Sequence, residues 1–126
     1  MGADLDLQFE ALTQKIIGAG FAVSNGLGHG FLEAVYRNAL AEELRLAGLS
    51  AEREKPFPVS YRDKQVGIYV ADLVVEGRVI VELKAVTQLG EASVAQVLNY
   101  LRASRLSVGL LMNFGTPRLQ WRRVIH

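Results

Sequence analysis

The spacing of apolar positions divides the chain into helical and extended segments. Apolar residues recur every three to four positions over residues 5–24 and 31–47, which predicts two helices. The first helix leads into the glycine-rich segment 25–30, and the second ends at Gly48, where glycine permits a positive φ. From residue 51 the period falls to two, which is typical of β-strands.

The middle of the chain predicts a meander of three strands. We expect strands at residues 56–61, 66–75 and 79–86, with turns at residues 62–64 and 76–78 between them. The second and third strands are almost continuously apolar. We therefore expect both to be buried on both faces and central in a sheet.

The last third of the chain predicts one helix followed by two strands. Residues 91–104 predict a third helix, residues 108–113 a buried strand and residues 119–125 a more polar strand at an edge. The order of helix, helix, three strands, helix and two strands predicts an α/β fold with a mixed sheet. Because 126 residues suffice for one core, we expect residues 1–126 to form a single domain.

Composition excludes several classes of protein. Hydrophobic residues make up 50% of the chain, which excludes disorder and is compatible with a homodimer contact. The absence of cysteine excludes a disulfide scaffold, a thiolate zinc site and a cysteine nucleophile. The N-terminal segment lacks a positive n-region, and apolar runs fall short of the ~20 residues that cross a bilayer. We expect a cytoplasmic protein that does not associate with membranes.

Charge is distributed unevenly, although the formal net charge is only +1. All 13 acidic residues lie at or before Glu91. Beyond it the chain carries arginines and no acid: Arg102, Arg105, Arg118, Arg122 and Arg123. Such asymmetry indicates a side that faces a polyanion, although ordinary surface arginines explain it equally well.

Three charged residues interrupt the predicted buried strands. Asp72 lies in the second strand, and Glu82 and Lys84 share one face of the third. A buried charge is costly unless it is paired or holds a metal. A three-residue turn at residues 76–78, or a compensating bulge, would place Asp72 directly opposite Glu82, whereas a two-residue turn would direct it to the other face. A cluster of functional side chains therefore predicts the three-residue turn.

This trio of residue types suits phosphodiester hydrolysis. Two adjacent carboxylates repel each other unless a cation lies between them, and oxygen ligands beside a substrate phosphate suit Mg²⁺. A neighbouring lysine can orient the attacking water or help to deprotonate it. A plain buried ion pair between one of the acids and Lys84 explains the same residues without any catalysis, and both interpretations stay open.

Polar residues on the predicted helices extend the candidate site. Gln96 and Tyr100 lie one turn apart, away from the apolar stripe of their helix, so they face either a substrate or simply the solvent. Glu33 lies near the start of the second helix, where a carboxylate also stabilises the helix dipole. Tyr36 could equally belong to the core.

Several of these motifs together resemble one known family. The resemblance lies in Gly30, Glu33 and Tyr36, then in Asp72, the Glu82-Leu83-Lys84 triplet, residues 96–100 and residues 110–115. These residues are similar to the GxxExxY protein family, which is grouped with the PD-(D/E)XK nuclease superfamily. The Gln96-x-x-x-Tyr100 element resembles that of RecB-like exonucleases. Ala71 departs from the superfamily pattern, which has proline before the aspartate.

The resemblance implies a restriction-endonuclease-like core, a mixed β-sheet with a central antiparallel hairpin flanked by helices. It implies that Mg²⁺ or Mn²⁺ is bound by Asp72, Glu82 and the backbone carbonyl of Leu83. Glu33 would join them directly or through water, and Lys84 would serve the attacking water. Gln96 and Tyr100 would steady the site or the substrate strand.

The function that the resemblance implies is a metal-dependent nuclease that cuts nucleic acid, with DNA favoured by family analogy. The alternative is a non-catalytic module that binds nucleic acid or a protein partner through the same fold. The intact set of Asp72, Glu82 and Lys84 favours the enzyme. If the buried charges only fixed the strand register, neutralising both acids would be harmless or stabilising.

Overall fold

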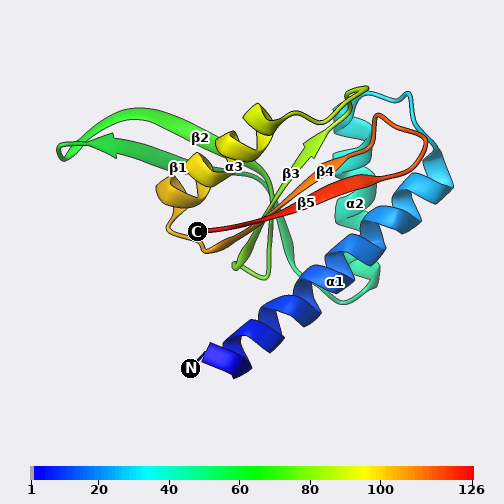
Figure 1. Ribbon diagram of the computed structural model, residues 1–126, viewed down its shortest axis with the longest axis horizontal. Helices are drawn as coiled ribbons and strands as arrows, with labels where there is room; N and C mark the ends of the chain where they lie inside the picture. The colour runs from blue at the N-terminus through cyan, green and yellow to red at the C-terminus, as the bar shows by residue number, and fades with distance from the viewer. Residues whose placement is uncertain (1) are drawn as a thin grey trace.

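A five-stranded mixed sheet with helices on both of its faces forms the fold (Figure 1). The computed structural model describes residues 2–126, and the side chains of residues 9–126. Over this range the elements are α1 (Gly2–Leu27), α2 (Glu33–Leu46), β1 (Ala51–Tyr61), β2 (Lys64–Val75), β3 (Val79–Lys84), α3 (Glu91–Ser104), β4 (Val108–Asn113) and β5 (Gln120–Ile125). The predicted α/β class is confirmed.

The strands lie in the order β1-β2-β3-β4-β5, so β3 is the central strand and β5 an edge strand, as predicted. β3 and β4 are parallel, and all the other neighbours are antiparallel. Parallel neighbours need a crossover connection, which α3 provides. The predicted bounds of α3 and β4 agree with the structure.

Two apolar cores lie on the opposite faces of the sheet. Along β3, Val79, Val81 and Leu83 pack in the core that α1 and α2 cover, whereas Ile80 packs in the core beneath α3. Side chains alternate along a strand, so the next even position, Glu82, lies on the α3 face. A charged residue therefore sits at the end of an apolar row.

β1 and β2 extend beyond the sheet as a two-stranded arm (Figure 1). β2 pairs with β3 only over residues 73–75, and its earlier residues pair with β1 alone. The prediction that the second strand is buried on both faces is therefore wrong for its first half, where Val66 and Ile68 are 63% and 61% exposed. The arm ends in a two-residue turn at Arg62 and Asp63, both at positive φ, rather than in the predicted three-residue turn.

Tyr36 holds the connection between α1 and α2. Its hydroxyl donates to the carbonyl oxygen of Gly28 at 2.8 Å and accepts from the N–H of Phe31 at 3.1 Å. Its buried ring stacks on Phe114, with 4.9 Å between the centroids. Gly28 and Gly30 have φ of 72° and 111°, which a side chain would disfavour.

Because of this connection α2 begins at Glu33, two residues later than predicted. Leu32 therefore precedes the helix and is 81% exposed. Tyr36 is a core residue that positions Glu33 in the first turn of the helix. Elsewhere α1 is longer than predicted, β1 begins at Ala51 instead of residue 56, and β3 ends at Lys84 instead of residue 86. Within residues 2–126, no helix combines the length and apolar character that a membrane span requires.

Candidate active site

The register of the β2–β3 hairpin places Asp72 opposite Glu82. Val75 pairs with Val79 across the turn at residues 76–78, and the ladder continues to the pair of Leu73 and Val81. One step further along the same register, Asp72 faces Glu82. The predicted three-residue turn is confirmed, and with it the juxtaposition of the two acids.

Side-chain hydrogen bonds replace the strand ladder at this level. Asp72 Oδ2 accepts the N–H of Leu83 at 2.9 Å, and Glu82 Oε1 accepts the N–H of Asp72 at 3.1 Å. Each carboxylate is therefore held by a main-chain N–H group of the opposite strand. The side chain of Leu83 points into the core beside α1 and α2, while its N–H anchors Asp72.

Burial and the charge of Asp72 favour the protonated form of Glu82. Glu82 is only 7% exposed, and its burial, followed by the negative charge of Asp72, raises its pKa to about 8. A proton or a cation therefore stabilises the pair. Among the described side chains no group of three or more acids, histidines or cysteines is placed to hold a metal ion. Two carboxylates fit Mg²⁺ nonetheless, because this ion keeps several waters and substrate oxygens as ligands.

Tyr69 orients Glu82 and was missed by the sequence analysis. Its hydroxyl donates a hydrogen bond to Glu82 Oε1. Its ring stacks on Tyr100, with 3.5 Å between the centroids, and on Phe57, with 6.2 Å. Burial, and then the charge of Glu82, raises the pKa of Tyr69 far above its usual range, so its hydroxyl remains a donor. The available signal was one tyrosine in an aliphatic strand, three residues before Asp72.

Arg37 is the counterion of Asp72. Its guanidinium lies 3.5 Å from Asp72 Oδ1 and 3.2 Å from Glu54 Oε1. Arg37 follows Glu33 by one helical turn, so both project from one face of α2. This spacing of four residues from Glu33 is the signal in the sequence that indicates Arg37.

Glu54 occupies the β1 position beside Asp72. The pairs of Arg53 with Leu73 and Lys55 with Ala71 flank this position. Glu54 has φ of 53°, a conformation that costs a non-glycine residue about 1 kcal/mol or more. Glu54 and Asp72 occupy neighbouring positions of β1 and β2 and share Arg37 as their counterion. The alternation of polar and apolar residues along β1 does not indicate the positive φ of Glu54.

Glu33 and Lys84 complete the cluster. Burial, and then the charge of Asp72, raises the pKa of Glu33, whereas Lys84 and Arg37 lower it. The charges of Asp72 and Lys84 therefore act on Glu33, although no hydrogen bond or ion pair among the described side chains joins Glu33 to either residue. Among the described side chains Lys84 forms no ion pair, so its ammonium group is available to a substrate.

The segment that follows Lys84 is held by the end of β4. The buried Asn113 accepts the N–H of Val86 and donates to the Val86 carbonyl oxygen, each at 3.0 Å. A Cβ on Gly115 would lie 2.3 Å from the Val86 nitrogen, so only glycine fits there. These contacts fix the chain directly beyond the candidate catalytic lysine.

The two predicted residues of α3 differ in their surroundings. Tyr100 stacks on Tyr69 and so contacts the group that holds Glu82, and burial raises its pKa. Gln96 is exposed one turn earlier, where its side chain makes no hydrogen bond to the described residues. The structure therefore gathers Glu33, Asp72, Glu82, Lys84 and Tyr100, and leaves Gln96 facing solvent.

Comparisons with known proteins agree with this fold. A solved structure titled "Crystal structure of SSO0001" resembles the chain with a TM-score of 0.57 at 19% identity. The match covers 95% of this chain and 60% of that one, so the chain spans less than two-thirds of the solved protein. A comparison with curated proteins finds no match. The model of the PD-(D/E)XK nuclease superfamily matches residues 10–124. This match takes in nearly the whole sheet with its acids and lysine, and the chain belongs to the PD-(D/E)XK nuclease superfamily.

Proposed function

We propose that the chain is a metal-dependent nuclease, one domain over residues 1–126, that hydrolyses phosphodiester bonds in DNA. The observation that carries this proposal is the pairing of Asp72 with the buried Glu82 across the β2–β3 hairpin. Superfamily membership supports it, because nucleases are the usual members. A purely structural role accounts less well for two repelling acids that adjoin a lysine without an ion-pair partner among the described side chains.

Asp72 and Glu82 are the proposed ligands of Mg²⁺ or Mn²⁺, with the backbone carbonyl of Leu83 and with Glu33 directly or through water. When bound, the cation offsets charge that develops on the phosphoryl oxygens and favours ionisation of water. The chain supports these ligands by fixing both carboxylates through main-chain N–H groups. Preorganised ligands of this kind need little rearrangement during the reaction.

The other polar residues of the site have separate roles. Lys84 orients the attacking water and stabilises negative charge on the phosphoryl group. Tyr69 holds Glu82 through its hydroxyl, and Arg37 offsets the charge of Asp72. Tyr100 and the exposed Gln96 steady the substrate strand beside the acids, which is the role that the RecB-like element implies.

Within the superfamily we place the chain in the GxxExxY family. Gly30 at positive φ, Glu33 at the helix start and Tyr36 bound to the loop carbonyl give each residue of this motif a distinct physical task. The tyrosine and the glycine shape the connection, and the glutamate supplies the carboxylate. The motif therefore positions Glu33 toward Asp72 and Lys84.

A cleavage assay tests the proposal. Wild type is incubated with linear duplex, circular duplex, single-stranded DNA and RNA in the presence of Mg²⁺, Mn²⁺ or EDTA, beside Asp72→Ala and Lys84→Ala. We expect metal-dependent cutting of DNA that both substitutions abolish, whereas Lys15→Ala, an exposed lysine of α1, keeps it. Unchanged cutting by folded Lys84→Ala contradicts the proposed site. Absence of cutting on every substrate favours the non-catalytic binding module.

A further inference from the structure

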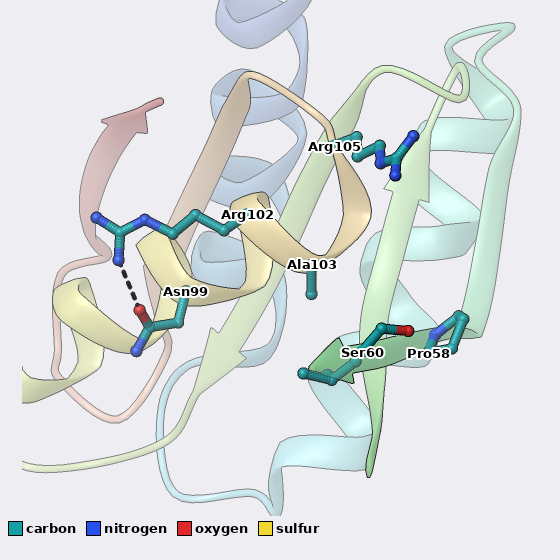
Figure 2. Close-up of a pocket in the computed structure, with 7 residues that line it drawn as sticks. Pro58, Ser60, Asn99, Arg102, Ala103 and Arg105 are labelled. Atoms are coloured by element: carbon teal, nitrogen blue, oxygen red, sulfur yellow. Dashed lines mark hydrogen bonds between the residues drawn. The ribbon is translucent and has the colours of Figure 1, made fainter. Parts of the chain in front are cut away.

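A groove separates the arm from α3 on the face of the sheet that carries Glu82. Its volume is about 630 Å³, and it is lined by residues 58–60 of β1 and by Asn99, Arg102, Ala103 and Arg105 of α3 and its C-terminal cap (Figure 2). The small side chain of Ala103 points toward the strand that carries Pro58 and Ser60 (Figure 2). The groove is therefore open between helix and arm.

The charge of this groove is unbalanced. Among the described residues that line it, Arg102 and Arg105 are the charged ones, and both are exposed. Arg102 donates to Asn99 Oδ1 at 2.9 Å, and neither arginine pairs with a carboxylate of the described residues. The groove is thus a place where positive charge is left free.

The two arginines flank the floor of the groove. Figure 2 shows their guanidinium groups on opposite sides of Ala103. Arg105 caps α3 with φ of 63°, so the chain turns there and separates its side chain from that of Arg102. Two separated guanidinium groups with an amide and a hydroxyl nearby, from Asn99 and Ser60, form a set of donors. Such a set suits successive phosphates of a strand.

The groove adjoins the acid cluster. Asn99 is the neighbour of Tyr100 on α3, and Val59 shares a face of β1 with Phe57, two residues earlier. Tyr100 and Phe57 both stack on Tyr69, the residue bound to Glu82. A strand that leaves the acids along α3 would enter this groove.

We propose that the groove binds the sugar–phosphate backbone of the nucleic-acid strand that flanks the scissile phosphate, with Arg102 and Arg105 as its phosphate contacts. This inference rests on the proposed nuclease function and names where its substrate lies. Arginine side chains that contact phosphates hold a nucleic-acid backbone without reading its sequence. Binding is therefore independent of sequence and sensitive to salt.

Fluorescence anisotropy in EDTA tests the groove apart from catalysis. Labelled single-stranded DNA and the matching duplex are titrated with the full chain, with Arg102→Gln/Arg105→Gln and with Arg45→Gln/Lys15→Gln, which loses the same charge elsewhere. We expect about tenfold weaker binding for the groove variant, and a slope of log affinity against log salt that is smaller by about 1 to 2. The control should stay within twofold of wild type. Arg102→Lys/Arg105→Lys should restore most of the affinity.

Equal affinity of the groove and control variants overturns the proposal, and so does failure of wild type to bind either probe. The cleavage assay separates this result from the fate of the nuclease function. If wild type cleaves DNA and the groove variant binds and cleaves equally well, the groove is wrong and the nuclease stands. If binding depends on both arginines but no DNA is cut, the groove stands and the nuclease function fails.

Discussion

Asp72 and Glu82 are joined at the end of the β2–β3 ladder by hydrogen bonds of side chain to main chain. The Glu82 carboxylate accepts the N–H of Asp72, and the Asp72 carboxylate accepts the N–H of the residue after Glu82. Each side chain takes the place of a backbone carbonyl in the ladder. Here β2 leaves β3 and continues with β1 as the arm. The two acids therefore lie at the position where β2 separates from β3.

The first prediction concerns the pH dependence of folding without metal. The folded protein holds the pKa of Glu82 at about 8, against 4.5 for an ordinary glutamate. The folded state binds more protons than the unfolded state between these values, so stability should fall as pH rises from about 4.5 to about 8 and level off above. Each tenfold change in proton affinity contributes ~1.4 kcal/mol. Urea unfolding in EDTA across this range measures the effect.

Glu82→Gln should remove most of this pH dependence, because the amide is neutral throughout. At pH 8 in EDTA the variant should be more stable than wild type, and near pH 5 the two should be similar. Glu10→Gln, which changes an exposed acid of α1, should keep the wild-type slope. A wild-type stability that stays level from pH 5 to pH 8 would show that Glu82 is not perturbed.

The second prediction concerns Tyr69 as a positioning residue. Tyr69→Phe keeps the ring that stacks on Phe57 and Tyr100 but removes the hydroxyl that donates to Glu82. Loss of such a hydrogen bond to a metal ligand lowers metal affinity by roughly 10- to 100-fold in other proteins, and we expect a loss in this range. Calorimetric titration with Mn²⁺ measures it without substrate. Tyr61→Phe, at the exposed end of the arm, should bind Mn²⁺ as wild type does.

The hairpin register follows from the sequence only if Asp72 and Glu82 are taken to act together, because a three-residue turn sets them opposite each other and a two-residue turn does not. The apolar runs alone leave the register open, because both faces of these strands are apolar. The arm was not predictable in the same way. Val66 and Ile68 continue the alternation of a buried strand, yet β3 does not accompany them, so they remain exposed.

The residues that the sequence analysis missed depend on this departure from regular strands. Glu54 reaches Arg37 with a positive φ in the middle of β1, which no period of two encodes. Tyr69 meets Glu82 although the two strands have already stopped pairing. These contacts depend on how β1, β2 and β3 twist relative to one another, and the local pattern of apolar and polar residues does not indicate this twist.

The third prediction concerns Arg37, the counterion of Asp72. Arg37→Gln leaves Asp72 and Glu54 without their cation, so the metal-free protein should lose about 1 kcal/mol of stability. The same change removes a positive charge from the acids, so Mn²⁺ should bind several-fold more tightly. Urea unfolding and calorimetry measure these opposite effects. Arg45→Gln, which breaks an exposed pair with Glu42, should change neither quantity appreciably. Weaker Mn²⁺ binding by Arg37→Gln would mean that Arg37 supports the ligands instead of competing with the ion.

The last prediction concerns Gly115, which supports the segment after Lys84. A Cβ at this position would lie 2.3 Å from both the nitrogen and the oxygen of Val86, and these are backbone atoms that cannot rotate away. Gly115→Ala must therefore displace residues 85 and 86 and weaken their hydrogen bonds to Asn113, at a cost of about 1–3 kcal/mol. Gly26→Ala, in α1 with no atom within 4 Å of the new Cβ, should instead stabilise by about 0.5–1 kcal/mol. Thermal unfolding gives both signs. Cleavage by Gly115→Ala, measured well below its melting temperature, should fall because Lys84 shifts with the segment. Full cleavage activity in a destabilised Gly115→Ala would show that the position of Lys84 does not depend on this support.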